Sequence, residues 1–196
     1  METDSPGIGT RPRLRADARR NIEGIRRAAL GVFRERGLGT ALDDVARAAG
    51  VSKGTVYHRF GGRQGLIDAI VEELVGELIE AIFAEAAAVE RPAESLETYL
   101  RLVWMLQFDE PAANDVLLRA VPESEPLCAL CERVSAFGAG LLAAAQAEGT
   151  VRGDLTPDDV YALIRERGLV ARACDRGSRA EYERRLAFVL GGILTR

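Results

Sequence analysis

Apolar residues recur every four positions between residues 63 and 89, and this spacing constrains the fold more than any other feature of the chain. The repeated pairs are Leu66/Ile67, Ile70/Val71, Leu74/Val75, Leu78/Ile79 and Ile82/Phe83. An α-helix turns once in about 3.6 residues, so this spacing places the pairs on one broad apolar stripe. A helix of about 27 residues spans about 40 Å and is long enough to link two parts of a molecule.

The remainder of the chain has the same helical character. Ala, Leu, Glu and Arg dominate, and no segment shows a convincing alternation of apolar and polar residues, as a half-buried strand would. We expect further helices at about 18–36, 41–48, 53–60, 93–108, 111–121, 126–148, 157–174 and 179–195. The predicted fold class is therefore all-α with about nine helices. Thr40, Thr156 and Ser178 each precede an acidic residue by three positions, which predicts capping boxes.

Charge is divided unevenly along the chain, although the whole has a net charge of only −4. Residues 1–66 hold 13 Lys and Arg against 7 Asp and Glu, whereas residues 67–196 sum to −10. A basic head on an acidic body suggests that one end of the molecule meets a polyanion. We divide the chain into a flexible basic arm (1–17), a head (18–65) and a body (66–196).

Several classes of protein are disfavoured by what the sequence contains. The start of the chain has no apolar stretch of signal-peptide type, and no apolar run approaches the roughly 20 residues needed to cross a bilayer. Three cysteines, an odd number, suit a reducing compartment better than a disulfide framework. His58 is the only histidine, and no nucleophile–base pair or phosphate loop is visible. We expect a cytoplasmic protein that is not an enzyme, has no cofactor or metal and contacts no membrane.

Residues 41–60 have the dimensions of a helix-turn-helix. Small side chains at Ala46 and Ala49 allow close helix packing, and Gly50 permits a sharp turn before Val51. Hydrogen-bond donors then share the outer face of the second helix, namely Ser52, Lys53, Thr55, Tyr57, His58 and Arg59. Gly54 has no side chain, so a phosphate could approach the backbone there. This pattern predicts a DNA-reading helix.

Two stretches resemble the TetR family of bacterial repressors. ALDDVARAAGVSKGTVYHRFGGRQGLI is similar to its helix-turn-helix and fourth-helix start, with the core V-S-x-G-T-x-Y-x-x-F, and NIEGIRRAALGVFRERGLGT is similar to its first helix. The resemblance implies a homodimer that binds double-stranded operator DNA. The DNA contacts that it implies are Thr40, Ser52, Lys53, Gly54, Thr55, Tyr57, His58 and Arg63. The chain departs from the family at Arg63, where lysine is usual, and in the glycine-rich GGRQG.

The resemblance also implies a small apolar or amphipathic effector that enters the middle helices and releases the protein from DNA. Aromatic and soft side chains dominate such pockets. The pocket candidates of this type are Tyr99, Trp104, Met105, Phe108 and Cys128. The same side chains also suit an ordinary core, so a structural role for each remains an alternative.

The last two predicted helices are candidates for the dimer seam. Their apolar residues are Val160, Leu163, Ile164, Val170, Leu186, Val189, Leu190, Ile193 and Leu194. Paired with those of a second copy, the two helices would form a four-helix bundle. The alternative is that these stripes close the core of the monomer.

Parts of the sequence are also compatible with functions besides repression. A helical protein-interaction module would explain the acidic body, and Cys128 with Cys131, one helical turn apart, would suit a redox-sensing module. A regulator of the same fold could also activate transcription. The arginines of the arm (Arg11, Arg13, Arg15, Arg19 and Arg20) either enter the minor groove or add non-specific affinity.

Overall fold

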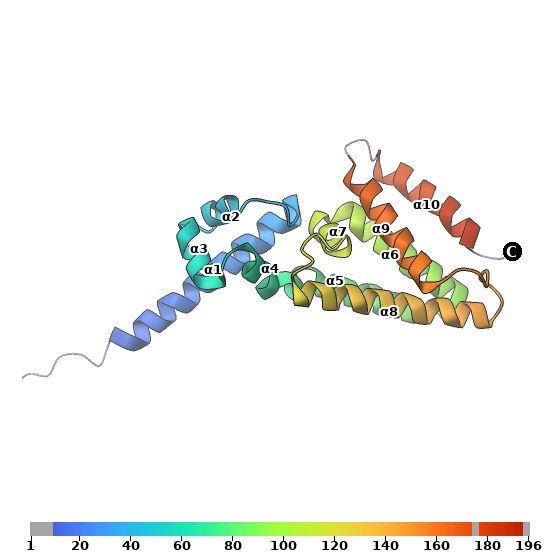
Figure 1. The fold of residues 1–196 in the computed structure, drawn as a ribbon, viewed down its shortest axis with the longest axis horizontal. Helices are drawn as coiled ribbons and strands as arrows, with labels where there is room; N and C mark the ends of the chain where they lie inside the picture. Colours follow the sequence, from blue (N-terminus) through green and yellow to red (C-terminus); the bar gives the residue numbers. More distant parts are fainter. Residues whose placement is uncertain (1–9, 174–176, 194–196) are drawn as a thin grey trace, which may run out of the picture.

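The structure is a computed structural model that describes residues 10–173 and 177–193. Within those residues the chain is all-α, as predicted, and forms nine continuous helices without a strand (Figure 1). The head contains α1 (Thr10–Arg36), α2 (Leu42–Ala48) and α3 (Lys53–Phe60). After the connecting helix come α6 (Pro92–Asp109), α7 (Pro111–Leu117), α8 (Glu125–Ala147), α9 (Pro157–Arg172) and α10 (Arg179–Ile193).

The connecting helix contains a π-helical turn that the sequence pattern does not reveal. It begins as α4 (Arg63–Val71), widens into the π-turn η1 (Glu72–Gly76) and continues as α5 (Glu77–Ala87). The prediction of one uninterrupted α-helix is therefore wrong in this detail. Two arginines of α1 bond its carbonyls, Arg26 Nη1 to Ala69 O at 2.8 Å and Arg34 Nη2 to Glu73 O at 3.4 Å. A π-turn interrupts the regular ladder of backbone hydrogen bonds, and these arginines supply donors beside it.

The first helix begins at Thr10, about two turns before the predicted start near Ala18. Residues 10–17, which we assigned to the flexible arm, are thus helical, and the first nine residues of the arm lie outside the described residues. Arg, Leu and Ala favour a helix, and a proline is tolerated in the first turn, where its missing N–H is not needed. Figure 1 shows this part of α1 projecting beyond α2 and α3.

The structure confirms two of the three predicted capping boxes and contradicts the third. Thr156 and Asp159 form the predicted capping box, and Ser178 pairs with Glu181 in the same way, its N–H donating to Glu181 Oε2 at 2.8 Å. The predicted cap at Thr40 is wrong. Its hydroxyl instead donates to Gly37 O at 2.9 Å, and α2 follows Ala41, whose methyl group cannot cap a helix.

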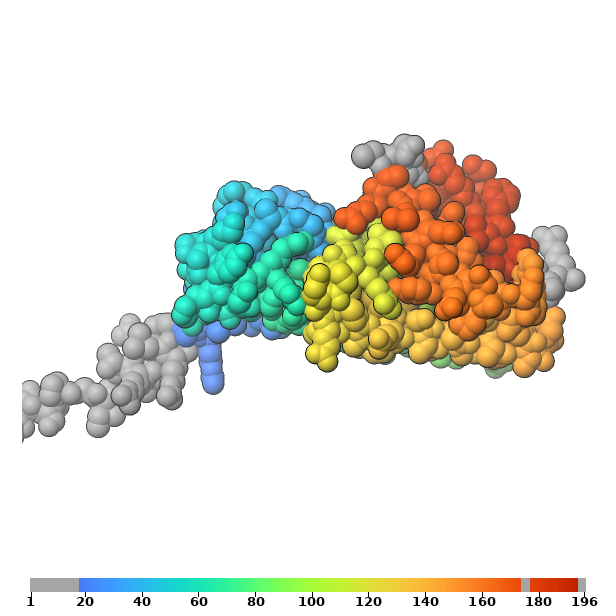
Figure 2. Space-filling view, in the orientation of Figure 1, coloured from blue at the N-terminus to red at the C-terminus, as the bar shows by residue number. Residues whose placement is uncertain are grey.

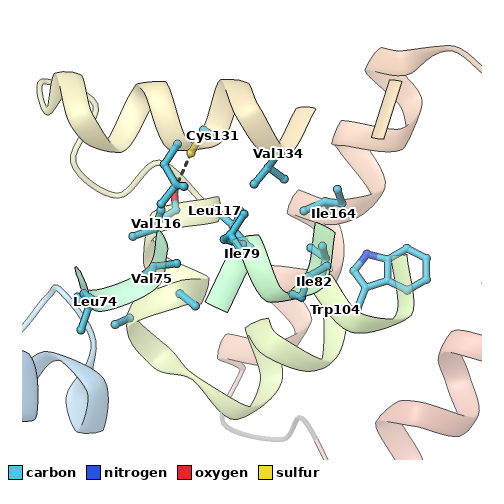
Figure 3. Packing of buried hydrophobic residues seen from close by; sticks show 14 of the residues in the cluster. Leu74, Val75, Ile79, Ile82, Trp104, Val116, Leu117, Cys131, Val134 and Ile164 are labelled. Carbon is cyan, nitrogen blue, oxygen red and sulfur yellow. Dashed lines mark hydrogen bonds between the residues drawn. The ribbon is translucent and has the colours of Figure 1, made fainter. Parts of the chain in front are cut away.

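The core of the body is built around α6, which packs against α5, α8 and α9. Figure 3 shows part of this core, with Ile79 and Ile82 from α5, Trp104 from α6 and Ile164 from α9. In the same view the thiol of Cys131 donates to Val116 O at 3.2 Å. Burial of apolar surface between these helices supplies most of the driving force for folding.

A buried carboxylate on α7 joins the head to the body, which Figure 2 shows as two adjacent lobes. Asp115 Oδ2 accepts the backbone N–H of Leu38, just after α1, at 2.7 Å. Asp115 Oδ1 lies 3.0 Å from Arg172 Nη1, at the end of α9. The carboxylate therefore holds three separate parts of the chain together.

By length and composition, α8 could span a membrane, with a mean hydropathy of 1.5 over its most apolar window. One such helix is weak evidence, because core helices pass the same test. In this protein one face of α8 is buried by the body, through residues such as Leu127, Leu130 and Val134.

Replacement of Gly65 tests the packing between α3 and α4. A Cβ at this position would lie 1.8 Å from Phe60 O, a backbone atom that cannot move without shifting the end of α3. We expect Gly65→Ala to lower the free energy of unfolding by about 1–3 kcal/mol. Urea denaturation followed by circular dichroism measures the change.

Gly140→Ala is the matched control, because a Cβ at Gly140 in α8 meets nothing within 4 Å. Alanine there should raise the free energy of unfolding by about 0.5–1 kcal/mol. Equal effects of the two substitutions would contradict the close packing of α4 against the end of α3.

Candidate nucleic-acid interface

The turn between α2 and α3 fixes the angle at which α3 leaves the head. Gly50 has φ +66°, which favours glycine, and Val51 N–H donates to Ala46 O at 3.0 Å. Val45 and Val56 are fully buried between the two helices and the rest of the head. The predicted helix-turn-helix geometry is thus present, with Val56 facing the core as expected.

The first turn of α3 is suited to an anion. Ser52 caps the helix by accepting the Thr55 N–H at 3.1 Å, and the two hydroxyl oxygens lie 2.9 Å apart. The N–H groups of a helix's first turn have no partners within the helix and attract negative charge. A Cβ at Gly54 would meet only Ser52 Oγ, at 3.7 Å, so the fold itself does not require glycine there.

The side chains predicted to contact DNA lie mainly on the outer face of α3. Ser52, Lys53, Gly54, Tyr57 and His58 are exposed, whereas Thr40, Thr55 and Arg63 are half-buried. Lys53 and Tyr57 are one turn apart, as are Gly54 and His58, so the helix brings them together.

Tyr57 lies on the surface and not in the core, with 52% of the residue exposed. Its ring packs over Gly62, where a Cβ would lie 2.9 Å from Tyr57 Cε1. Gly62 also has φ +109°, a value that favours glycine. The close ring contact therefore holds an exposed tyrosine in one orientation without burying its hydroxyl.

Lys53 of α3 forms an ion pair with Asp43 of α2 within the head. Lys53 Nζ lies 2.9 Å from Asp43 Oδ2 on α2, and this hydrogen bond raises the pKa of Lys53. Sequence reasoning assigned Asp43 to a capping box and missed this pairing. A lysine ten residues away on a different helix gave no local signal of it.

The glycine-rich segment after α3 does not shift the predicted start of α4, which begins at Arg63. Gly61 ends α3 in the left-handed conformation, with φ +73°. Arg63 Nε is buried and has no hydrogen-bond partner within the described residues. Gly65, further along, is required by the close approach of Phe60 O.

The predicted effector-contacting residues are distributed over the body. Tyr99 donates its hydroxyl to Val134 O at 2.6 Å and lines a narrow space against α8 and α9 that has no room for a water molecule. Trp104, Met105 and Phe108 are buried in the core, and the Phe108 ring lies 4.8 Å from that of Tyr182 on α10. Cys128 is half-buried near the start of α8. The structure does not bring these five side chains into one cavity, and effector contact stays a prediction.

The two cysteines of α8 differ in environment. Burial raises the pKa of Cys131 to about 11, so its thiol stays protonated at neutral pH. The Cys128 thiol donates to Pro122 O at 3.4 Å. Because the thiolate is the reactive form, the raised pKa of Cys131 disfavours a redox-sensing role.

Most residues proposed for the dimer seam instead close the monomer core. Val160, Ile164, Leu186, Leu190 and Ile193 are all buried within the chain. Leu163, Val170 and Val189 are half-buried, and Leu194 lies outside the described residues. The exposed large apolar residues on these helices are Leu169 and Phe188, which the stripe pattern did not include. The stripe marks the face that contacts α6, because each helix must first pack on its own chain.

Two family models match the chain over these same regions. One, described as bacterial regulatory proteins of the tetR family, matches residues 25–70. The other, described as the C-terminal domain of SbtR-like transcriptional regulators, matches residues 91–195, more than half of the chain. The chain belongs to the TetR family. The predicted resemblance is confirmed, and it extends from the head into the body.

Individual relatives agree with this assignment. The HTH-type transcriptional regulator BetI of Rhizobium meliloti is 33% identical over 76 residues, which cover 38% of this chain and 37% of BetI. The alignments with curated relatives thus span less than half of those proteins.

Solved structures extend the comparison to nearly the whole chain. A TetR transcriptional regulator of Streptomyces coelicolor is 32% identical, with a TM-score of 0.55, over 88% of this chain and 98% of that one. AibR, solved with isovaleryl coenzyme A and operator DNA, is 17% identical, with a TM-score of 0.69, over 88% of this chain and 97% of its own. At that identity AibR shows a shared fold.

Removal of the Asp43 carboxylate tests the ion pair in the head of this TetR-family protein. In Asp43→Asn, Lys53 is free to meet a phosphate, so we expect tighter binding to any duplex DNA. The slope of log K against log salt should steepen by about 0.9, the value for one additional phosphate contact on B-DNA. Fluorescence anisotropy with a labelled duplex across a salt series measures both quantities.

Asp44→Asn is the matched control, because Asp44 pairs with Arg47 on its own helix and not with α3. It removes the same charge from the neighbouring position. A salt slope that changes equally in both variants would show that net charge, and not release of Lys53, controls DNA affinity.

Proposed function

We propose that this chain is a homodimeric repressor that binds a pseudo-palindromic operator with α3 in the major groove. One observation carries the proposal: the outer face of α3 presents Lys53, Tyr57 and His58 on a helix positioned by a helix-turn-helix. Recognition helices of this motif read base edges with a few such side chains while others bind phosphates. The net charge of +6 over residues 1–66 adds attraction to the duplex.

Dimerisation would supply the second half-site. A single small DNA-binding module buries too little surface for tight, specific binding. Leu169 on α9 and Phe188 on α10 are 61% and 70% exposed, and a groove of about 530 Å³ between these helices is lined by Leu163, Phe188 and Val189. Exposed apolar side chains beside a groove favour a self-complementary contact in which Phe188 of each copy enters the groove of the other.

Release from DNA would follow binding of a small apolar or amphipathic effector within the body. Among relatives of this fold, AibR has been solved with isovaleryl coenzyme A as well as operator DNA. Trp104 Nε1 is buried without a hydrogen-bond partner in the described residues, so an effector that reached it could accept that N–H. Such an effector needs only a higher affinity for the state in which the recognition helices are misplaced. A cytoplasmic setting follows from this role.

Gly54→Ala tests the DNA-binding role without disturbing the fold. The added methyl group meets only Ser52 Oγ, at 3.7 Å, and would lie between the helix backbone and a phosphate. We expect the affinity for a fragment of its own promoter region to fall at least about tenfold, which is about 1.4 kcal/mol. Anisotropy titrations with that fragment and with an unrelated fragment, over several salt concentrations, measure affinity and specificity.

Gly140→Ala serves again as the control, since it makes the same change on α8, far along the chain from α3. It should leave DNA affinity unchanged. Equal, weak binding of every fragment by the unmodified protein would refute an operator-specific regulator, and undiminished binding by Gly54→Ala would refute the proposed docking of α3.

Phe188→Glu tests the dimer. A carboxylate at this exposed position would be buried without a partner at the proposed seam, which is costly. We expect the molar mass from light scattering after size exclusion to fall from that of a dimer to that of a monomer. Leu78→Glu, a charge at an exposed leucine of α5, should remain dimeric. A dimer that survives Phe188→Glu but not Leu78→Glu would place the seam on another face.

A further inference from the structure

A cavity of about 210 Å³ lies where the head meets the body. Its walls come from the end of α1, the end of α6, the start of α7 and the end of α9. The polar residues that line it are Arg36, Gln107, Asn114, Asp115 and Arg172. This cavity is separate from the narrow space beside Tyr99 and from the groove beside Phe188.

The charges around this cavity favour an anion. Two guanidinium groups, of Arg36 and Arg172, line it together with one carboxylate, of Asp115. Arg172 is already 3.0 Å from Asp115, but a guanidinium has five N–H donors and can bind a second carboxylate. Pro111 and Ala171 contribute apolar wall between the charged groups.

A buried amide in the same cavity lacks a donor. Gln107 is 1% exposed and donates its Nε2 to Asn114 Oδ1 at 3.2 Å, while Asn114 donates to Gly168 O at 3.0 Å. Gln107 Oε1 has no partner within the described residues. A buried acceptor without a donor is unfavourable, so a bound molecule with an O–H or N–H group would satisfy it.

The amide is held in this position by a close approach to α9. A Cβ at Gly168 would lie 2.3 Å from Gln107 Nε2 and 2.6 Å from Asn114 Oδ1. The glycine therefore allows both amides to pack against the α9 backbone. An unpartnered acceptor on a residue of a cavity that two arginines also line has the features of a preformed site.

We propose that this cavity binds a small carboxylate that also carries a hydrogen-bond donor, such as a short hydroxy acid. Its carboxylate is bound by Arg172 and Arg36, and its hydroxyl donates to Gln107 Oε1. The volume suits a molecule of a few carbon atoms. This inference adds a ligand site to the proposed DNA-binding function and rests on that function only for its effect on the operator.

Occupation of the cavity acts on the joint between head and body. A carboxylate bound to Arg172 shares that guanidinium with Asp115 and weakens their ion pair, and Asp115 also accepts the Leu38 N–H at the end of α1. A weaker Arg172–Asp115 pair leaves the head held less firmly to α7. The expected consequence is a lower affinity for DNA, because the two recognition helices of a dimer must keep a fixed separation.

Isothermal titration calorimetry of the full chain with lactate and 3-hydroxybutyrate tests the site, with propionate and butyrate as probes that lack the hydroxyl. We expect at least one hydroxy acid to bind, and its hydroxyl-free partner to bind about tenfold more weakly. Absence of binding by both hydroxy acids at about 10 mM, or equal binding with and without the hydroxyl, would overturn the proposal.

Three single substitutions test whether the hydroxy acids bind in this cavity. Arg172→Gln removes a largely exposed guanidinium, and Gln107→Met removes the acceptor while keeping the side-chain length; thermal unfolding confirms that each is folded. Both should weaken hydroxy-acid binding at least about tenfold, whereas Arg165→Gln, an exposed arginine of the same helix outside the cavity, should not. Binding that all three variants retain would place the probes elsewhere and overturn the site.

Operator titrations separate this inference from the proposed function. Tight, specific DNA binding that the hydroxy acid weakens supports both. Specific DNA binding that does not respond to a bound hydroxy acid overturns the coupling through Asp115 and leaves the regulator intact. Hydroxy-acid binding without specific DNA binding supports the proposed ligand site and refutes the proposed operator-specific repressor.

Discussion

Asp115 connects parts of the chain that are far apart in sequence, and the placement of the DNA-binding head depends on it. Its carboxylate accepts the N–H of Leu38, 77 residues earlier, and pairs with Arg172 on α9. Gly37 makes the approach possible, since a Cβ there would lie 2.5 Å from Asp115 Oδ2. A buried carboxylate that loses one of its hydrogen-bond donors is costly, so the interaction that joins head and body is unfavourable to break in part.

The same end of the molecule contains further exchangeable contacts. Arg26 and Arg34 of α1 bond carbonyls beside the π-turn, and Lys53 of α3 is paired with Asp43. Each interaction joins a charged side chain to a partner that DNA, a ligand or a helical rearrangement can replace. Val56 and Ile25, by comparison, are fully buried, so the head has an apolar core of its own.

Local pattern predicted the exposed outer face of α3 well. The positions of Gly50, Ser52 and Val56 follow from turn, cap and helical spacing, and these depend on neighbours within a few residues. The predicted cap at Thr40 is wrong because a hydroxyl three residues before an acid satisfies the capping pattern in sequence, while the chain places it one residue too early to cap. The Lys53–Asp43 pair could not be predicted, because it depends on the angle between two helices.

By itself, the sequence determined the helical fold class, the order and approximate limits of the helices, the family and the face of α3 that meets solvent. All of these follow from residue spacing and local capping. Tertiary structure decided where the apolar stripes of α9 and α10 point, where α4 widens into a π-turn and which polar groups gather around Asp115. Those features arise where segments distant in sequence compete for the same space and the same hydrogen bonds, and such competition leaves no periodic signal in either segment.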